Sequence, residues 1–575
     1  MVLPFRFSPA NKPPLRIGLL LDNVHLSAVF ARVVEDIQAS NFAKLELLVF
    51  HKKPASNGTS PAKRSLLANV GARIRDPKLR GRALYDLYLK LDLRTRPAND
   101  PLKTVDCTNA FVGIESLEVE PIGKKFIQRF PPEAIDRIKS KDLDVILRFG
   151  FNILHGDILQ SARYGVWSFH HGDNEFYRGG PPHFWELVER APLSGAILQV
   201  LTEELDAGLV LCKSQFATER SLSVSRNRYA PYWGSCGMVI RKLNELHQYG
   251  WERLREHAVP AAAYQGKRKI YRNPKNWDMA RWLAPVILKK TLGQPFRRKK
   301  VAHWRIAIRN SMQRLFEDPD ISGFQWLESP AGHFWADPFL LEHGGKKWLF
   351  YEDYSYARRR ADIACAEMLP DGTLGPPLSC LSNEHVHYSY PHVFHADSSV
   401  WMTPETVATN SVDLYLCQEF PSKWRKERTL LEGRYVDPTL WEREGKWWMA
   451  VTSADPDSRA GCLLLFYADS LTGEWHFHPS NPISTDIRNN RGAGRIIRVG
   501  ERLIRPSQSG CPIYGYSFSF HEITGLTETS YNERLISTTT PQRFKGLTGV
   551  HSYACLGDFE VIDGQSQRTL KKLKG

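Results

Sequence analysis

The stretch WSFHHGDNEFYRGGPPHFWELVERAPLSGAILQVLTEELDAGLVL, residues 167–211, decides the fold of the first part of this 575-residue chain. In it an apolar run ends in S-F-H-H-G-D, Y-R-G-G-P-P opens a helix-like F-W-E-L-V-E, and L-D-A-G follows an alternating A-I-L-Q-V-L. His170 and Asp206 therefore stand at the ends of two extended segments, where a parallel sheet presents its side chains to a ligand. The stretch predicts a cleft in which these two residues carry out acid–base chemistry.

The residues before this stretch predict a doubly wound α/β domain. LRIGLLL (15–21) and KLELLVF (44–50) are short apolar runs typical of buried strands, and the residues between them have helical spacing. DVILRFG (144–150) and YGVWSFH (164–170) add two further strands. We therefore expect one α/β domain over residues 1–215. Because the turn after LRIGLLL lacks G-x-G-x-x-G, no dinucleotide cofactor is expected.

Composition sets the outer bounds of these predictions. At 575 residues the chain is too long for one hydrophobic core, so two or three domains are expected. Its apolar fraction of 42% is that of ordinary globular protein, and its net charge of +15 favours anionic partners. No window approaches ~18 consecutive apolar residues and the N-terminus lacks a signal-peptide core, so we expect a soluble, cytoplasmic chain. Nine cysteines without a C-x-x-C pair favour reduced thiols, and no metal site is expected.

Residues 142–211 resemble the N-terminal catalytic domain of the folate-dependent formyltransferases, the group that contains methionyl-tRNA formyltransferase and the sugar N-formyltransferases. The motifs F-N-I-L-H-G-D-I-L, S-F-H, Y-R-G-G, L-S-G-A-I-L-Q and L-D-A-G follow that family's order and spacing, including 36 residues from His170 to Asp206. The resemblance implies a Rossmann-like domain that moves a formyl group from 10-formyltetrahydrofolate to an amine. An amino sugar or a nucleotide-linked sugar is the favoured acceptor.

The resemblance also assigns roles to residues. His170 would donate to the oxyanion and carry the proton, and Asp206 would orient its ring and raise its pKa. Ser168 stands where the family has Asn, and a hydroxyl has one donor where a carboxamide has two. It stays open whether the folate sits differently, His171 or Asn174 takes over, or activity is weak. The implied catalytic residues are Ser168, His170 and Asp206; the implied cofactor-binding residues are Phe149, Gly150, His171, Arg178, Gly179 and Leu205.

Residues 216–315 are expected to form a helical, basic connector. VIRKLNELHQYGWERLREHA (239–258) is amphipathic with helical spacing, and the run from Lys289 to Arg309 holds eight Lys or Arg and no acid. Such a run is compatible with a solvated linker or a phosphate backbone contact. It is also compatible with an anionic membrane surface, with Trp282 and Trp304 as interfacial anchors. Localisation is therefore expected to be cytoplasmic or peripheral at the inner membrane surface.

The remainder, residues 316–575, predicts an all-β domain. FWADPFLLEHGGKKWLFYED (334–353), YSYPHVFHADSSVWMTPET (388–406) and YVDPTLWEREGKWWMAVTS (435–453) share one layout: a D-P or Y-P turn, an apolar strand, a polar hairpin and an aromatic strand. Repeated units of this kind predict a five-bladed β-propeller. Residues from about 324 to 531 resemble the propellers of arabinanase- and xylosidase-type glycoside hydrolases. More closely, they resemble the N-terminal region of the plant glucosamine inositol phosphorylceramide transferases.

The propeller resemblance implies a carbohydrate site in the central funnel. Asp337 and Asp437 match the first-strand aspartates of the hydrolase propellers, and Glu405 in T-P-E-T is a further funnel candidate, so these three are the expected substrate-binding residues. Two carboxylates that flank a sugar can cleave it, so glycan binding, hydrolysis and pure scaffolding all stay open. Further contacts to a sugar or phosphate are expected from His333, Trp335, His392, Arg491 and Arg505.

Taken together, the sequence favours a formyltransferase that acts on an amino sugar and carries a glycan-binding propeller. The rival hypothesis is a carbohydrate-binding or carbohydrate-cleaving propeller protein whose formyltransferase-like domain has lost catalysis. Initiator-tRNA formylation ranks below both, because the propeller replaces the small barrel that follows the catalytic domain of the tRNA enzyme. Nucleic acid is therefore disfavoured as a partner.

Overall fold

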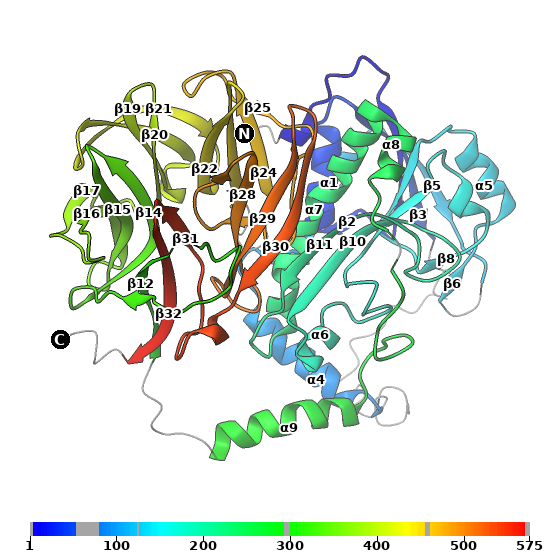
Figure 1. The fold of residues 1–575 in the computed structure, drawn as a ribbon. Helices are drawn as coiled ribbons and strands as arrows, with labels where there is room; N and C mark the ends of the chain where they lie inside the picture. The colour runs from blue at the N-terminus through cyan, green and yellow to red at the C-terminus, as the bar shows by residue number, and fades with distance from the viewer. Residues whose placement is uncertain are drawn as a thin grey trace. The chain divides into compact units, whose positions relative to one another are not determined.

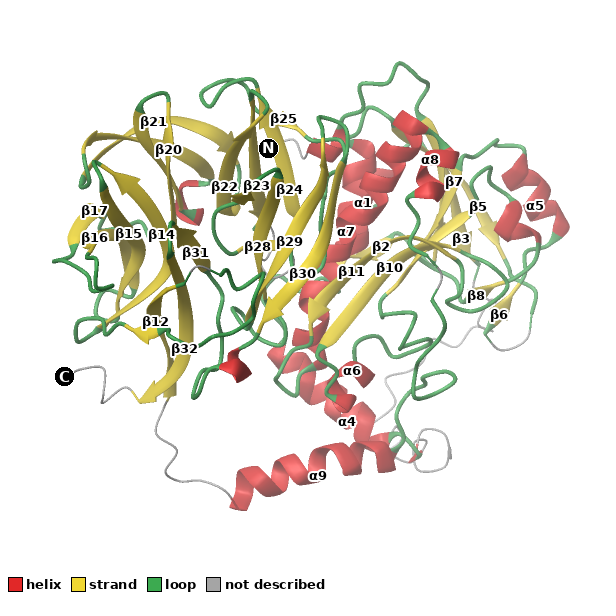
Figure 2. Ribbon diagram, viewed as in Figure 1, coloured by secondary structure: helices red, strands yellow, loops and turns green. Residues whose placement is uncertain are grey.

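The computed structural model describes residues 4–52, 80–123, 126–260, 262–292, 300–311, 313–454 and 461–569. The chain divides into two compact units, Val2–Pro295 and Phe296–Gly575. The first unit, here called the α/β unit, mixes helices with one large sheet, whereas the second contains strands almost throughout (Figure 2). The expected combination of a Rossmann-like α/β domain and an all-β propeller is confirmed.

The α/β unit is built on a seven-stranded sheet with the order β11-β10-β9-β7-β1-β3-β5. The five strands from β9 to β5 are parallel, and β10 and β11 extend the sheet in antiparallel fashion. Its strands are β1 Leu15–Leu21, β3 Ala43–His51, β5 Glu115–Val119, β7 Val145–Arg148, β9 Val166–His170, β10 Leu193–Val200 and β11 Leu209–Ala217. Since β1 lies between β3 and β7, the chain order reverses there, which opens a crevice at the carboxyl ends of the strands.

Helices cover this sheet, and small strand pairs form in the segments that connect its strands (Figure 1). The helices are α1 Ala28–Gln38, α4 Ala83–Asp92, α5 Pro132–Lys139, α6 Trp185–Glu189, α7 Val224–Tyr249, α8 Trp251–Glu256 and α9 Asn276–Leu292. The small pairs are β2 His25–Ser27 with β4 Thr104–Asp106, and β6 Ile127–Gln128 with β8 Ile153–Leu154. Single 3-10 turns in the chain are Pro4–Arg6, Leu93–Thr95, Asn109–Phe111, Asp157–Gln160, Val407–Thr409 and Pro541–Arg543.

The segment expected as a connector contributes to both units. Residues 216–292 include α7, α8 and α9 of the α/β unit, and residues 300–310 form a strand of the propeller. Part of the basic run, residues 293–299, lies outside the described residues. The two tryptophans expected as membrane anchors are buried, Trp282 at 9% and Trp304 at 6% exposure, so neither is available as an anchor. Within the part of the chain that the structure describes, no helix is long and apolar enough to cross a membrane.

The propeller consists of five sheets, one for each expected blade. Four of them are consecutive meanders, and the fifth combines strands from both ends of the unit. In that closing blade β12 pairs antiparallel with β32, from Lys300 opposite Thr569 to Asn310 opposite Phe559. This pairing joins strands from the two ends of the unit within one blade, so the ring of blades is closed.

The five blades are β13-β12-β32-β31, β14-β15-β16-β17, β18-β19-β20-β21, β22-β23-β24-β25, and β26-β28-β29-β30 with β27 on β28. The first three blades of the meander and the closing blade comprise β12 Lys300–Asn310, β13 Gln325–Trp326, β14 His333–His343, β15 Lys346–Ser355, β16 Arg360–Met368, β17 Leu378–Leu381, β18 Ser389–Ala396, β19 Ser399–Glu405, β20 Ser411–Glu419, β21 Lys423–Glu432, β22 Tyr435–Arg443, β23 Lys446–Ser453, β24 Leu463–Ala468, β25 His476–Phe477, β31 Tyr553–Leu556 and β32 Phe559–Thr569. The remaining blade comprises β26 Arg491–Gly492, β27 Ile497–Val499, β28 Arg502–Ser509, β29 Ser517–Leu526 and β30 Tyr531–Thr539.

The three repeated sequence openings form the first strands β14, β18 and β22, which contact one another in sequence around the ring. The residue before proline in each, Asp337, Tyr390 or Asp437, has a positive φ of 50°, 47° or 54°. Each of these positions interrupts the strand pairing as a β-bulge. The same backbone device therefore places Asp337, Tyr390 and Asp437 at equivalent positions of three blades.

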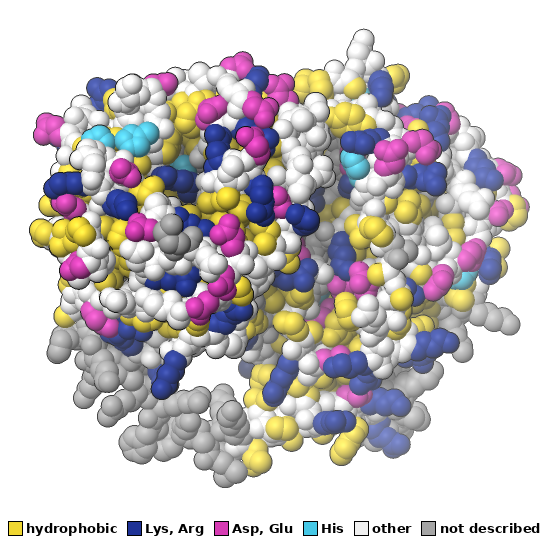
Figure 3. Space-filling view, viewed as in Figure 1, with side chains coloured by type: hydrophobic (Ala, Val, Ile, Leu, Met, Phe, Trp, Pro, Cys, Tyr) yellow, Lys and Arg dark blue, Asp and Glu magenta, His cyan; other side chains and the backbone are white. Residues whose placement is uncertain are grey.

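Charged side chains of both signs are interspersed over the face of the molecule drawn in Figure 3. On that face the Lys and Arg side chains lie among Asp and Glu and do not merge into one continuous basic surface. The face drawn in Figure 3 therefore offers no single basic patch as a binding surface for an anionic partner.

Candidate functional sites

In the α/β unit the structure brings His170 and Asp206 together. His170 ends β9, and Asp206 lies in the turn before β11 with a φ of 54°. The Nδ1 atom of His170 is 3.3 Å from Oδ1 of Asp206, and its Nε2 atom is 2.7 Å from the carbonyl oxygen of Tyr177. Because both neighbouring atoms are acceptors, the ring donates from both nitrogens. Burial opposes the charge, but the Asp206 carboxylate and the Tyr177 carbonyl raise the pKa of His170 above its ordinary value.

Ser168 is held by a residue that the sequence analysis did not select, Arg148. The two lie opposite each other on the parallel strands β7 and β9. A guanidinium nitrogen of Arg148 donates to Oγ of Ser168 at 2.8 Å, and the hydroxyl in turn donates to the carbonyl of Phe169 at 3.2 Å. The one donor of Ser168 is therefore used within the protein. An arginine that ends an apolar strand beside the site strand was the available signal for Arg148.

Arg148 brings its charge close to His170 and Asp206. Burial lowers the pKa of its guanidinium, and the carboxylates of Asp206 and Asp22 oppose that shift. Asp206 thus faces two cationic groups, Arg148 and His170, and the pKa of its carboxyl lies below its ordinary value although burial alone would raise it. The negative charge of Asp206 is therefore compensated by Arg148 and His170 without any added ligand.

The loop 171–180 covers the His170 ring. A Cβ atom added at Gly172 would lie only 2.8 Å from Nε2 of His170, so the backbone passes directly over the ring. The loop is fastened by buried Asp173, whose carboxylate accepts from Nζ of Lys213 on β11 at 2.8 Å. The polar G-D-N-E-F sequence of this loop thus serves an ion pair with the neighbouring strand.

Three of the expected cofactor-binding residues make contacts within the α/β unit. The ring of Phe149 stacks on Phe30 with centroids 4.4 Å apart. Gly150 is where the backbone after β7 approaches the end of β1, and an added Cβ would collide with that backbone. The ring of His171 stacks on Tyr232 at 3.7 Å, and burial lowers the pKa of His171 to about 3. His171 is therefore neutral and does not replace a protonated donor.

The other three lie around the turn that holds Asp206. Arg178 pairs with Glu204 at 3.0 Å. The backbone N–H of Gly179 donates to Oδ2 of Asp206 at 2.9 Å, and this glycine has a φ of 91°. Leu205 is half-buried in the turn that precedes Asp206. Gly179 of the R-G pair therefore positions the carboxylate that holds His170.

A second buried polar group, missed by the sequence analysis, lies beside this loop. His183 and Glu186 are each 1% exposed, and Nδ1 of His183 is 3.6 Å from Oε1 of Glu186. Neither ring nitrogen of His183, nor Oε1 of Glu186, has a hydrogen-bond partner among the described residues. Burial raises the pKa of Glu186 to about 7. These two residues line a cavity of about 10 Å³ together with His171 and Tyr177.

In the described arrangement, two donors that formyl transfer would need are already in use. The Nε2 atom of His170 donates to Tyr177, and the hydroxyl of Ser168 is already used, so neither is free to donate to a formyl oxygen. The adjoining cavity of about 10 Å³ accommodates about one water molecule. Sites for small organic ligands usually enclose roughly 300–1,000 Å³.

In the propeller, Asp437, Glu405 and Arg491 form one buried constellation. Arg491 donates to both carboxylate oxygens of Asp437, at 2.7 and 2.8 Å, and lies 3.6 Å from Oε2 of Glu405. Glu405 also accepts the backbone N–H of Asp437 at 3.1 Å. The guanidinium lies 5.1 Å from the ring of Tyr514, whose side chain remains exposed. Glycine at 492, after Arg491, leaves the space that this packing needs, because a Cβ there would meet the Tyr390 hydroxyl at 2.6 Å.

Asp337 belongs to a neighbouring constellation with His551, Ser552 and Asp563. The hydroxyl of Ser552 donates to Oδ1 of Asp337 at 2.8 Å, and the backbone N–H of Asp337 donates to Asp563 at 3.0 Å. Nδ1 of His551 donates to Asp563 at 2.8 Å, while its Nε2 lies 3.6 Å from Asp337. Asp337, His551 and Asp563 each offer one side-chain atom that could ligate a metal ion, and these three atoms lie within 4.8 Å of one another. A protonated His551 supplies the positive charge between the two carboxylates, and they raise its pKa despite burial.

Five carboxyl groups gather in one part of the propeller, here called the acidic end. Glu352 pairs with Ala336, and Glu405 pairs with Ser389, so both lie beside the beginning of a first strand. Burial, and then neighbouring carboxylates, raise the pKa values of Glu352 and Glu405 well above the ordinary value. The cations at this end are Arg491 and His551. The acidic end consists of Asp337, Glu352, Glu405, Asp437 and Asp563.

Of the five auxiliary residues expected to contact a sugar or phosphate, only Arg491 lies at the acidic end. Arg505 pairs with Glu533 at 2.7 Å, and His333 pairs with Asp353 at 2.8 Å. The other two residues, Trp335 and His392, are buried in the propeller. Glu352, His551 and Asp563 could not be selected from the sequence, because no motif marks them.

The propeller region matches a known family. Residues 293–553 match the family model described as glucosamine inositolphosphorylceramide transferase 1, N-terminal. Glucosamine inositolphosphorylceramide transferase 1 of Oryza sativa subsp. japonica is 30% identical over 221 residues, which are 37% of this chain and 29% of the relative. The chain thus spans less than a third of the length of this relative.

Solved structures resemble each unit at low sequence identity. Glycinamide ribonucleotide transformylase 1 from Symbiobacterium toebii covers 40% of this chain and 88% of its own, with 12% identity and a TM-score of 0.26. The RS223 β-xylosidase covers 42% of this chain and 96% of its own, with 8% identity and a TM-score of 0.31. Similarities at this level carry no information about the activity of the chain.

Proposed function

We propose that the propeller binds a saccharide at its acidic end, as part of a sugar-transfer reaction. The observation that carries the proposal is the gathering of five carboxyl groups around two described cations, Arg491 and His551. Burying carboxyls with so little compensation costs free energy, which is typical of functional sites. Protonated carboxyls donate and ionised ones accept, so together they suit the hydroxyl and amino groups of a sugar.

The family match supports a carbohydrate ligand. It covers the propeller, and the matching relatives are named for glucosamine and for inositolphosphorylceramide. An amino sugar is consistent with the excess of carboxyl groups, because a protonated amine would add the missing positive charge. An exposed aromatic ring, Tyr514, lies beside Arg491 and suits stacking on a pyranose face.

Binding fits this geometry better than hydrolysis. Asp437 is held by two nitrogens of Arg491, and Asp563 accepts three backbone N–H groups, from Asp337, His551 and Ser552. Neither carboxylate is therefore free to act as base or nucleophile on a glycosidic bond. We accordingly assign the acidic end to recognition.

Calorimetric titration with glucosamine and with glucose tests this proposal. Glucosamine should bind more tightly than glucose, and Tyr514→Ala should weaken binding roughly tenfold through loss of ring stacking. Tyr249→Ala, which removes an exposed tyrosine of the α/β unit, is the matched control and should leave binding unchanged. Absence of binding by either sugar at millimolar concentration would refute a saccharide site.

Formyl transfer by the α/β unit is the second candidate function, favoured by the 3.3 Å approach of His170 to Asp206. It requires the loop 171–180 to leave the ring, because Nε2 of His170 now donates to Tyr177 within that loop. The acceptor would be an amino sugar or a nucleotide-linked sugar. The rival hypothesis, a formyltransferase-like unit without catalysis, is the better match to the closed arrangement.

Titration with tetrahydrofolate and 5-formyltetrahydrofolate separates these alternatives. If the loop opens for the cofactor, binding should be detectable, and His170→Ala should weaken it. Hydrogen exchange of the peptide covering residues 171–180 should then rise or fall on addition of folate. No heat and no change in exchange at millimolar folate would eliminate formyl transfer and leave the saccharide proposal untouched.

A further inference from the structure

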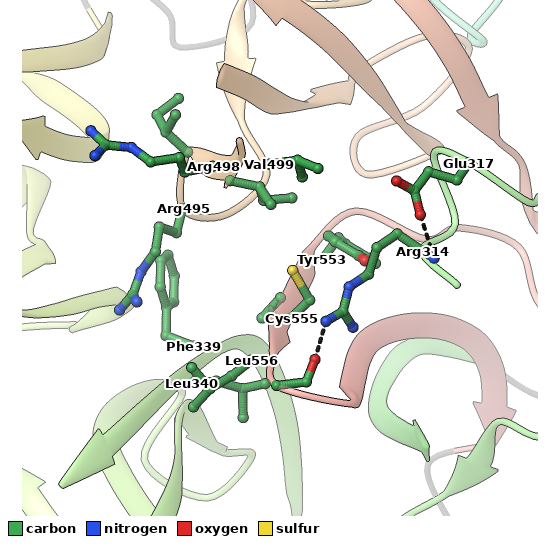
Figure 4. A pocket seen from close by; sticks show the side chains of 14 residues that line it. Arg314, Glu317, Phe339, Leu340, Arg495, Arg498, Val499, Tyr553, Cys555 and Leu556 are labelled. Carbon is green, nitrogen blue, oxygen red and sulfur yellow. Dashed lines mark hydrogen bonds between the residues drawn. The ribbon is translucent and has the colours of Figure 1, made fainter. Parts of the chain in front are cut away.

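The propeller contains a cavity of about 560 Å³ that neither proposed function uses. It is lined by residues 339 and 340 of β14, by β31 and by residues 495–499, together with Arg314 and Glu317 (Figure 4). Phe339 and Leu340 follow Asp337 along β14, and the β31 residues follow Ser552. The cavity therefore lies further along the inner strands than the acidic end.

The charge of this cavity is opposite to that of the acidic end. Three arginines, Arg314, Arg495 and Arg498, line it together with one acid, Glu317. Figure 4 shows Arg314 and Arg495 on either side of Cys555, whereas Arg498 extends away from it. Glu317 accepts the backbone N–H of Arg314 at 3.3 Å, and among the described carboxylates none forms an ion pair with the three guanidinium groups.

Among the described residues, these guanidinium groups donate to carbonyl oxygens of the main chain. Arg495 donates to the carbonyl of Val393, and Arg314 donates to those of Phe559, at 3.3 Å, and Gly557. Each guanidinium has five N–H donors, so most of the donors of Arg495 are not used by these bonds. Burial lowers the pKa of Arg495, consistent with a desolvated cation that lacks a counter-charge.

The buried arginines of the propeller are treated differently by the fold. Arg309, Arg491 and Arg505 are each hydrogen-bonded to a carboxylate at 2.7 or 2.8 Å. Leaving a cation partly buried without such a partner is unfavourable unless a ligand supplies the charge. Arg495 is half-buried, pairs with no carboxylate among the described residues, and lines the cavity of about 560 Å³.

We propose that this cavity binds a small organic phosphate through Arg495 and Arg314. Two guanidinium groups suit a phosphate dianion, which accepts several charge-assisted hydrogen bonds at once. The body of the ligand would rest on the apolar walls, and a cavity of about 560 Å³ is of the usual size for a small-molecule site. The apolar wall residues are Phe339, Leu340, Ile496, Ile497 and Val499.

Calorimetry on the full chain tests the proposal with phenyl phosphate and inorganic phosphate as probes. Phenyl phosphate should bind more tightly than inorganic phosphate, because its ring contacts the apolar wall. Arg495→Gln should weaken phenyl phosphate binding tenfold or more, since hydrogen bonds to charged groups contribute strongly. Arg502→Gln is the matched control, because Arg502 pairs with Glu522 on an exposed strand face and the net charge changes equally.

A chemical measurement on the unaltered protein guards against a variant that misfolds. Cys555 lines the cavity, and phenyl phosphate should slow its alkylation, whereas Cys417 on β20, outside the cavity, should be alkylated at an unchanged rate. Vesicles of phosphatidylcholine with and without phosphatidylinositol distinguish a lipid headgroup from a soluble phosphate as the source. Loss of vesicle binding in Arg495→Gln would indicate the lipid. No binding of either probe, no protection of Cys555, or unchanged affinity in a folded Arg495→Gln protein would overturn the proposal.

Discussion

Replacing Arg491 with methionine should destabilise the propeller by roughly 3–5 kcal/mol, as expected when one partner of a buried ion pair is removed. Methionine keeps most of the side-chain volume but leaves Asp437 and Glu405 without their cation. Saccharide binding at the acidic end should be lost as well, because Arg491 orients both carboxyls. Hydrogen exchange of peptides from β22 measures the free energy of opening in the propeller alone.

The ion-pair explanation has its own control. The double variant Arg491→Met with Asp437→Asn removes the uncompensated charge, so it should be more stable than the single Arg491→Met variant. Arg502→Met removes an exposed arginine paired with Glu522 and should change stability by less than ~0.5 kcal/mol. Equal destabilisation in the single and double variants would mean that packing of Arg491, and not its charge, supports the acidic end.

The fold could be predicted because its signals are local and repeated. LRIGLLL forms β1 over Leu15–Leu21 as expected, since an apolar run of strand length has few alternatives in an α/β pattern. The three repeated openings predicted the propeller. In the structure Asp337, Tyr390 and Asp437 each have a positive φ and each lie at a β-bulge. Tyr390 shows that the backbone device, and not the carboxylate, is what the repeat shares.

The sites were predictable only in part, because their contacts join distant segments. His170 and Asp206 were selected by spacing within one motif, and they lie 3.3 Å apart. The closed loop over His170 depends on Lys213 meeting Asp173 across 40 residues, which no local pattern encodes. At the acidic end, the bond from Asp337 to Asp563 spans 226 residues, because it crosses from the first full blade to the closing one.

Glu186 of the α/β unit gives the clearest expected dependence of stability on pH. Burial raises the pKa of its carboxyl from 4.5 to about 7, so the folded protein keeps this group protonated below that pH. The unfolded chain releases the proton from about pH 4.5 upward, so the stability contributed by the protonated carboxyl is lost as pH rises from 4.5 to 7. At 1.36 kcal/mol for each unit of pKa, the total loss is about 3 kcal/mol.

Glu186→Gln should therefore match the parent protein near pH 4.5 and exceed its stability by about 3 kcal/mol at pH 8, because glutamine cannot ionise. Because the pKa of His171 is lowered, the α/β unit also loses stability as the pH falls below 6.5, the ordinary pKa of histidine. This loss is the same in both proteins, so it cancels from the difference in stability between them. Hydrogen exchange of peptides from α6 and β10, corrected for intrinsic rates at each pH, measures the difference. Glu252→Gln on α8, whose side chain is 80% exposed, should show no such pH dependence. A difference between Glu186→Gln and the parent that stayed constant from pH 4.5 to 8 would mean that Glu186 is ionised in the fold, with His183 protonated beside it.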